Sequence, residues 1–191
     1  TGIYLSILLA NKSPDFDPGL LTTATAIAVT RTLEKTLALK PTIKWVNDVL
    51  VDDKKICGIL TEGITNLETQ SLSQVVVGTG INFLTKISTF PTELQARVGT
   101  LAHYVKKNRL SRNRFIATYL NEFFKIYQNY TTGSFMDEYR AHCDLIGKHV
   151  TIQRPTGTLE AQVIDINDHG ALVLENGKVL NSGEVIKVRK V

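Results

Sequence analysis

Residues 44–62 constrain the fold most, because two short aliphatic runs lie on either side of a tight-turn signal there. The runs occupy residues 49–51 and 55–60, and the Asp52-Asp53 pair between them is typical of a turn. The pattern predicts a β-hairpin and therefore a sheet. Charged and amide side chains interrupt these strands, although stability alone does not require them. We interpret the segment as the wall of a pocket for an acid and a nucleotide phosphate.

The remaining pattern predicts an α/β fold in two parts. Aliphatic runs predict strands, and apolar residues spaced by three and four predict helices. These strands and helices are expected at residues 3–10, 20–39, 74–83, 111–130 and 135–145. Ser111 is the predicted N-cap of the 111–130 helix. The predicted core stripe of this helix is Ile116, Leu120, Phe123 and Tyr127. Residues 85–93 resemble a surface loop in composition. We expect a mixed β-sheet with packed helices in residues 1–145 and a small β-barrel in residues 146–191.

Composition indicates a cytoplasmic globular protein. The chain has 191 residues, is 43% hydrophobic and contains no apolar run long enough to span a bilayer. Cys57 and Cys143 stand in no disulfide-framework or metal-ligand spacing, so a reducing compartment and no protein-held metal are expected. The net charge of +4 suits a nucleotide phosphate or an acidic partner. The basic cluster in residues 106–114 is interpreted as a solvated loop and helix start.

Lys55 is a candidate site residue with a structural alternative. In a regular strand it would share a face with Cys57 and Ile59. A lysine on an apolar strand is costly to bury unless an anion pairs with it. The structural alternatives are an edge lysine that opposes aggregation and a solvated turn residue beside Lys54. Gly58 likewise fits either a strand bulge or the close approach of a ligand to the backbone.

Asn47 and Asp48 precede the first strand of the predicted hairpin. The pair is common turn chemistry, and its spacing favours that interpretation. The functional alternative is a carboxylate that orients or deprotonates an incoming amine.

Gly78 and Gly80 lie inside a predicted strand, and Asn82 follows them. The dinucleotide fingerprint fails, because Phe83 stands where its third glycine would be. Two interpretations remain open. The glycines mark a bulged strand, or they expose backbone against which a flat ligand lies.

Two motifs in this order resemble the biotin protein ligase family. The first is Lys-Trp-Val-Asn-Asp at residues 44–48 followed by Lys-Lys-Ile-Cys-Gly-Ile-Leu-Thr-Glu at residues 54–62. The second is Val-Val-Gly-Thr-Gly-Ile-Asn at residues 76–82, and residues 2–6 are similar to the family's first strand. The resemblance covers nearly the whole chain. It implies a catalytic fold like that of class II aminoacyl-tRNA synthetases, followed by an SH3-like domain.

The resemblance implies an ATP-dependent biotin–[biotin carboxyl-carrier protein] ligase. The carboxylate of biotin attacks the α-phosphate of ATP, which enters with Mg²⁺, to give biotinyl-5′-AMP and pyrophosphate. A lysine of a biotin carboxyl carrier domain then attacks this anhydride. The implied site consists of catalytic Lys55 and Asp48, biotin-binding Lys55, Gly58, Leu60, Gly78 and Gly80, and nucleotide-binding Lys44, Asn47 and Asn82.

The sequence departs from the family pattern in two places. Val46 replaces a proline, and the Gly/Arg-rich loop that would precede residue 1 is absent. We therefore expect an N-terminally truncated catalytic domain, with DNA contact only through an upstream domain. A lipoate ligase or lipoyl transferase and a non-catalytic biotin-binding regulatory module are the alternatives. The resemblance also implies a homodimer that pairs through a sheet edge, and no membrane contact is expected.

Overall fold

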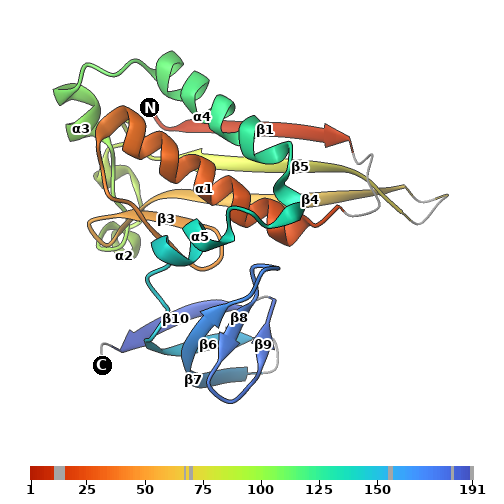
Figure 1. Ribbon diagram of the computed structural model, residues 1–191. Coiled ribbons are helices and arrows are strands. Elements are labelled where there is room, and N and C mark those ends of the chain that lie inside the picture. The colour runs from red at the N-terminus through yellow and green to blue at the C-terminus, as the bar shows by residue number, and fades with distance from the viewer. Residues whose placement is uncertain (11–15, 67, 69–70, 155–156, 182, 190–191) are drawn as a thin grey trace.

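The computed structural model describes residues 1–10, 16–66, 68, 71–154, 157–181 and 183–189. It contains two β-sheets, with helices packed on the first sheet and the second sheet beside it (Figure 1). The elements are β1 Ile3–Ala10, α1 Pro18–Leu37, β2 Thr42–Lys44, β3 Asp48–Val51, β4 Lys54–Asn66, β5 Ser71–Ile81, η1 Ile87–Thr89, α2 Thr92–Gln95, α3 Ala102–Lys107, α4 Arg112–Tyr127, η2 Tyr130–Thr132, α5 Met136–His142, β6 His149–Arg154, β7 Gly157–Ile166, β8 Leu172–Leu174, β9 Val179–Leu180 and β10 Glu184–Arg189.

The first sheet has the order β1-β5-β4-β3-β2, and its paired strands are antiparallel. The expected mixed sheet is corrected in this respect. Strands β2, β3 and β4 follow one another through short turns, which join antiparallel neighbours. In the described part of the chain, parallel pairing is confined to two isolated bridges, from Ile43 to Cys143 and from Lys55 to Val98.

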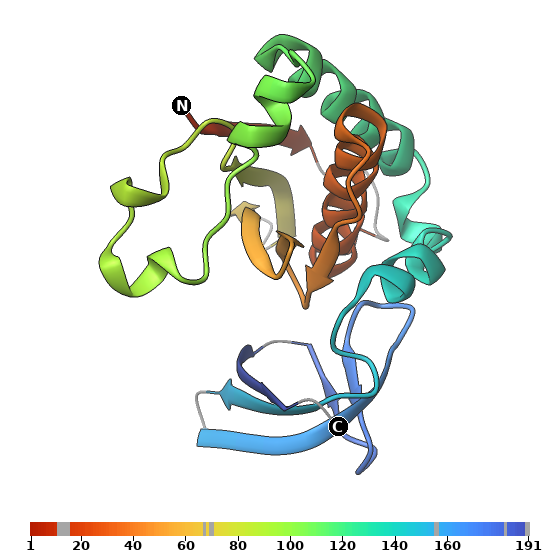
Figure 2. The same ribbon diagram turned by 90° about the vertical axis from the view of Figure 1, so that its left-hand side faces the viewer.

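Helices α1 and α4 cover one face of this sheet, and residues 84–101 lie on its other side (Figure 2). The helix-facing positions are buried, as at Ile7, Val77 and Ile59. Each such side chain contributes roughly 1.5–3 kcal/mol through removal from water. The other face is left for a site.

Helix α1 begins and ends at local signals. The Asp17 carboxylate accepts a hydrogen bond of 2.9 Å from the Leu20 N–H, which caps the first turn. Ala38 adopts a left-handed conformation with φ 52° and closes the last turn. The predicted boundaries, 20 and 39, therefore shift by two residues at each end.

The core stripe predicted for α4 is partly wrong. Phe123 is buried as expected, but Ile116, Leu120 and Tyr127 are only partly buried. The buried line instead contains Phe115, Tyr119 and Ile126. Tyr119 can occupy the core because its hydroxyl bonds to the buried Thr79 hydroxyl at 2.8 Å. Ser111 caps this helix as expected, through the Arg114 N–H.

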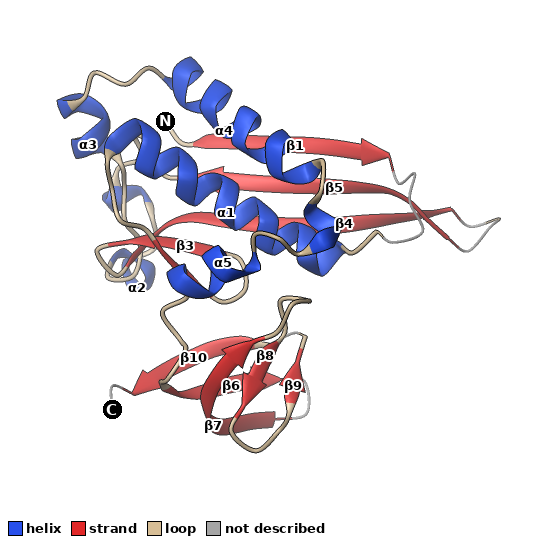
Figure 3. Cartoon of the chain, viewed as in Figure 1, coloured by secondary structure: helices blue, strands red, loops and turns tan. Residues whose placement is uncertain are grey.

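The second sheet has the order β10-β6-β7-β8-β9 (Figure 3). All its neighbouring strands are antiparallel, which confirms a small all-β module after the helices. The predicted barrel is corrected, because the pairing of the described strands does not close the sheet. The division into domains at residues 145 and 146 stays a prediction.

Candidate functional site

One row of residues crosses the open face of the first sheet. Register pairs Tyr4 with Gly80, Gly80 with Gly58, Gly58 with Asp48, and Asp48 with Lys44. Residues directly opposite each other on neighbouring strands project from the same face. Four predicted site residues therefore stand in one line, although they come from four different strands.

Three glycines form the floor of the site. Gly58 lies opposite Gly80, and Gly78 lies opposite Leu60 on β4. A Cβ at Gly78 would meet the Leu60 carbonyl oxygen at 3.5 Å, and one at Gly80 would meet the Tyr4 ring at 3.6 Å. The pairing of β5 runs through these glycines without a shift, so the interpretation of a bulged strand at this point is wrong. The floor is exposed backbone, bordered by larger side chains.

A bulge in β4 places Lys55 on this face. Leu50 pairs with Lys55, but the next residue toward the start of β3, Val49, pairs with Cys57. Ile56 is thus an extra residue in β4. The residues that precede it in this strand therefore project from the face opposite to the one that regular alternation would give them. The expectation that Lys55 shares a face with Cys57 is therefore wrong. Its ammonium instead lies over Gly58, where a Cβ would come within 3.2 Å of Nζ.

Lys55 pairs with the carboxylate of Asp48. The distance from Lys55 Nζ to Asp48 Oδ1 is 2.5 Å, and the two side chains are 44% and 19% exposed. Since β4 lies between β5 and β3, the interpretation of an edge lysine is wrong. The pair leaves a cation at the open surface, held in place from beneath by the glycine and from one side by the carboxylate.

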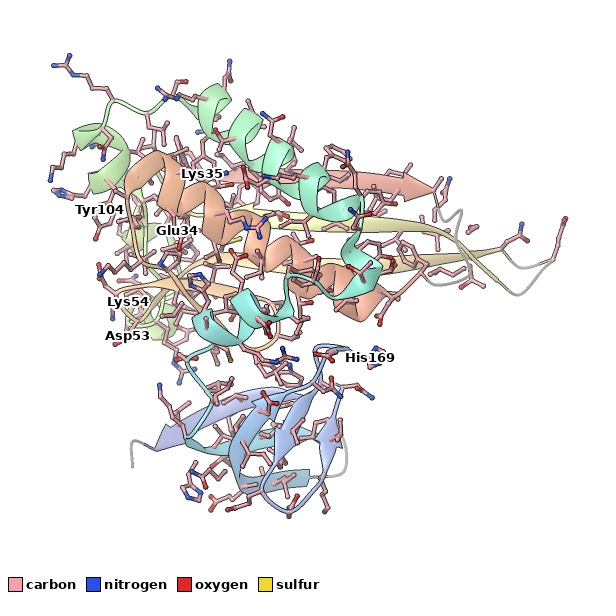
Figure 4. All side chains as sticks on the ribbon, in the orientation of Figure 1. Glu34, Lys35, Asp53, Lys54, Tyr104 and His169 are labelled. Atoms are coloured by element: carbon pink, nitrogen blue, oxygen red, sulfur yellow. The ribbon has the colours of Figure 1, made fainter. Side chains whose placement is uncertain are left out.

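The hairpin beside this pair is the one expected. Asp52 and Asp53 have φ values of 52° and 58°, which is the conformation of tight hairpin turns. The Tyr104 hydroxyl donates a hydrogen bond of 2.8 Å to the Asp52 carboxylate. Lys54 Nζ donates to the Ala96 carbonyl oxygen. Figure 4 shows Asp53, Lys54 and Tyr104 at one end of the molecule. The turn is thereby tied to the segment that overhangs the site.

The two candidate asparagines bind backbone. Asn47 Nδ2 donates to the Ile59 carbonyl oxygen at 2.7 Å. Asn82 Nδ2 donates to the Gly99 carbonyl oxygen at 2.9 Å and the Lys55 carbonyl oxygen at 3.3 Å. Asn47 lies in a turn, as its spacing favoured, and Asn82 follows the end of β5. Both hold the strand that carries Lys55, and their role in nucleotide binding stays a prediction.

Two adjoining pockets lie on the open face and share part of their walls. The first, of about 390 Å³, is lined by Asn47, Leu60 and Gly78, among others. The second, of about 560 Å³, is lined by Lys44, Asp48 and Asn82, among others. The residues common to both are Tyr4, Lys55, Gly58 and Gly80. All the predicted site residues therefore line one pocket or the other.

Sequence reasoning missed one wall of the larger pocket. Phe90, Leu94, Arg97 and Val98 line it, although residues 85–93 were expected to be a plain surface loop. Backbone bonds hold this wall in place, from Lys55 N–H to the Arg97 carbonyl at 2.9 Å and from Gly99 N–H to the Lys55 carbonyl at 2.8 Å. These contacts join residues about 40 positions apart, and no local pattern announces them. Tyr4 was also missed as a lining residue, although its alternate place in the first strand indicates the open face.

The surroundings of the pair are apolar on the helix side. Cys57, beneath it, is buried, and this burial raises the pKa of its thiol well above the usual value.

Within the described ranges, no group of three or more His, Cys, Asp or Glu side chains is placed to hold a metal ion. None of the helices in the described part of the chain is long and apolar enough to cross a membrane.

Two family models match the chain. The biotin/lipoate A/B protein ligase family matches residues 1–82, which include the strands of the glycine floor. The C-terminal domain of biotin protein ligases matches residues 145–188, which include the second sheet.

Curated relatives align along nearly the whole chain. The bifunctional ligase/repressor BirA of Bacillus subtilis is 29% identical over 180 residues, which cover 93% of this chain and 54% of BirA. The biotin–[acetyl-CoA-carboxylase] ligase of Mycobacterium tuberculosis is also 29% identical, over 90% of this chain and 63% of that protein. The chain thus spans about half the length of the Bacillus relative.

Solved structures share the fold. The biotin protein ligase of Aquifex aeolicus, in complex with biotin and ATP, has a TM-score of 0.78 and 23% identity, and the match covers all of this chain and 79% of that one. On the two family models, the curated relatives and the shared fold, the chain belongs to the biotin protein ligase family.

Proposed function

We propose that this chain activates biotin with ATP and transfers it to a lysine of a biotin carboxyl carrier domain. The observation that carries the proposal is the position of Lys55 on the boundary of the two pockets. An acid bound in one pocket and a nucleotide bound in the other would meet at its ammonium. The relatives named as biotin ligases and the Aquifex structure with biotin and ATP support the same assignment.

Lys55 supplies the charge that both steps need. Attack of the biotin carboxylate on the α-phosphate builds negative charge on phosphoryl oxygens, and aminolysis of the anhydride builds it on the acyl oxygen. A fixed cation stabilises these oxyanions more than it stabilises the substrates. Loss of such a group costs about 3–4 kcal/mol of barrier, or about 10²–10³ in rate. Lys44, in the same row of the sheet, adds a second cation on the nucleotide side.

Biotin occupies the smaller pocket in this proposal. Its flat rings lie on the backbone of Gly58, Gly78 and Gly80, where no Cβ intervenes, and against Leu60. Its carboxylate points to Lys55. ATP, which enters as its Mg²⁺ complex, occupies the larger pocket, with Asn82 beside it. Asn47 lines the smaller pocket, and its contact with the nucleotide stays a prediction. An aliphatic pocket with a few placed polar groups suits a ligand of this kind.

Asp48 has two roles in this proposal. It holds the Lys55 ammonium at 2.5 Å, and it accepts a proton from the incoming carrier lysine or orients that amine. The first role makes Asp48 necessary for adenylate formation as well as for transfer. A slowing of both steps therefore follows from removal of the carboxylate.

The test compares Lys55 with a lysine outside the site. Lys55→Ala is expected to lower the rate of biotinyl-5′-AMP formation by about 10²–10³. Lys125→Ala is the matched control, because Lys125 of α4 is exposed and lines neither pocket. Its rate should stay within a few fold of the unaltered chain. A Lys55→Ala rate as high as that of the control contradicts the proposal.

Asp48→Asn tests whether the carboxylate is needed for the transfer step. Transfer to the carrier is measured in a single turnover from added biotinyl-5′-AMP, so that adenylate formation is bypassed. We expect this transfer to slow by about 10²-fold, the lower end of the effect of general bases. Transfer at the unaltered rate excludes Asp48 as the base.

Ligand choice distinguishes the alternatives. Lipoate competing with biotin on equal terms would favour a lipoate ligase, which the biotin/lipoate family model also describes. Biotin binding without pyrophosphate release in the presence of ATP would identify a non-catalytic regulatory module. The carrier domain, a homodimer, DNA contact through an upstream domain and the cytoplasmic location stay predictions.

A further inference from the structure

A loop of the second sheet reaches the first part of the molecule. It comprises residues 167–171, between β7 and β8, and its His169 lies on the side that faces the helices (Figure 4). Arg140 of α5 donates to the Ile166 carbonyl oxygen at 2.6 Å and pairs with the Asp168 carboxylate. These two bonds fasten the base of the loop to α5.

The loop has a defined internal structure. The Asn167 side chain accepts hydrogen bonds from the His169 and Ala171 N–H groups at 3.1 and 2.9 Å. Gly170 has a φ of 76°, which favours glycine, and a Cβ there would come within 3.0 Å of Thr23 Cγ2 on α1. The Gly170 backbone therefore packs closely against Thr23 of α1.

Trp45 bonds to that carbonyl. Its indole Nε1 donates a hydrogen bond of 2.8 Å to the Gly170 carbonyl oxygen, and the residue is only 3% exposed. The peptide bond from Trp45 to Val46 is cis. The Val46 carbonyl oxygen accepts a hydrogen bond from the Tyr139 hydroxyl at 3.0 Å. Residues 45 and 46 are thus held by two contacts from outside the first sheet, one with the 167–171 loop and one with α5.

The same segment leads directly to the ion pair. Asn47 exchanges two hydrogen bonds with Ile59, one through its side chain and one from the Ile59 N–H to the Asn47 carbonyl at 3.0 Å. Asp48 follows and pairs with Lys55. Only two residues therefore lie between Trp45, which contacts the second sheet, and Asp48, whose carboxylate holds the cation.

We propose that Trp45 is a positioning residue, through which the 167–171 loop sets the place of Asp48 and hence of Lys55. The effect on the reaction rate rests on the proposed function, whereas the coupling between the 167–171 loop and residues 45–48 does not. A displacement of about 1 Å at a reacting group can cost up to 10²-fold in rate. The bond makes the second sheet a support for the site, although none of its residues lines either pocket in the described ranges.

The experiment removes the indole N–H and leaves the ring. Trp45 is the only tryptophan of the chain, so global replacement of tryptophan by 3-benzothienylalanine, which has sulfur in place of N–H, alters this position alone. Trp45→Phe is the second variant. The control is Ser111→Ala, which removes the N-cap of α4, far from the loop in sequence, and lowers stability by a similar amount.

Two readouts are measured on the full chain. Hydrogen exchange of the Ile59 amide and of residues 45–48 should quicken by about ten-fold in both Trp45 variants, the loss expected from one hydrogen bond, while exchange in β5 stays as before. The kcat for biotinyl-5′-AMP formation should fall by about ten-fold, with the KM for biotin changed by less than about three-fold, as expected of misplacement rather than lost binding. Ser111→Ala should neither quicken exchange specifically at residues 45–48 and Ile59 nor lower kcat specifically.

The outcomes separate the inference from the proposed function. Faster exchange confined to residues 45–48 and the Ile59 amide supports the coupling. If the unaltered chain and the variants also fail to form the adenylate, the proposed function fails and the coupling still stands. Unchanged exchange at residues 45–48 overturns the inference. So does faster exchange spread evenly over the chain as in Ser111→Ala, because this indicates a general loss of stability. Unchanged kcat beside locally faster exchange overturns the positioning role.

Discussion

Gly58→Ala tests whether the position of the Lys55 ammonium governs the rate. The added methyl would lie 3.1 Å from Lys55 Cε and 3.2 Å from Nζ, while the Asp48 carboxylate is 3.8 Å away. These distances to the lysine are tighter than ordinary van der Waals contact. The lysine is flexible and can yield, so the strand stays in place and the ammonium moves. Because alanine is about 0.5–1 kcal/mol better than glycine inside a strand, the fold should not weaken.

The size of the effect follows from the charge. If the ammonium moves from about 3 Å to about 4 Å from a developing oxyanion, the attraction at an effective dielectric constant of about 20 falls by about 1.4 kcal/mol. This corresponds to about a ten-fold lower rate of adenylate formation. Gly78→Ala is the comparison, since its methyl would make an ordinary contact at 3.5 Å with the Leu60 carbonyl oxygen and none with the lysine. It narrows the floor of the pocket, so it should raise the KM for biotin and spare kcat.

The assay is pyrophosphate release at saturating ATP over a range of biotin concentrations, with thermal unfolding as the check on folding. The reasoning predicts a lower kcat for Gly58→Ala and a higher KM for Gly78→Ala. Equal kcat values in the two variants, at equal stability, would refute the claim that the glycine positions the cation.

Three further predictions concern stability and reactivity. Tyr119→Phe leaves the buried Thr79 hydroxyl without its 2.8 Å partner, so it should lower the free energy of unfolding by about 1–3 kcal/mol in urea titrations. The double variant Tyr119→Phe/Thr79→Val should lose less stability than the sum of the losses in the two single variants. Ala38→Gly should raise stability by about 1 kcal/mol, because Ala38 has a φ of 52°; a lower melting temperature would contradict this. Burial raises the pKa of the Cys143 thiol to about 11 and that of the Cys57 thiol further. At pH 8, fewer than about one in a thousand of these thiols is therefore ionised. Both cysteines should resist a thiol reagent until the chain is unfolded.

Local patterns in the sequence were sufficient for the elements and for the identity of most site residues. The strand alternation, the Asp52-Asp53 turn and the Ser111 cap each depend on residues that are close neighbours in the chain. Such signals are readable because periodicity and capping are short-range properties. The two motifs likewise indicated an acid and nucleotide site, and the structure brings their residues to one face of one sheet.

The tertiary structure alone decided how those residues face one another. The extra residue at Ile56 turns Lys55 onto the open face, and this depends on the register with β3 rather than on the alternation within β4. The wall that contains Arg97 and the bond from Trp45 to Gly170 join residues about 40 and 125 positions apart. Contacts of this kind arise from the packing of distant segments, so a window of neighbouring residues carries no record of them.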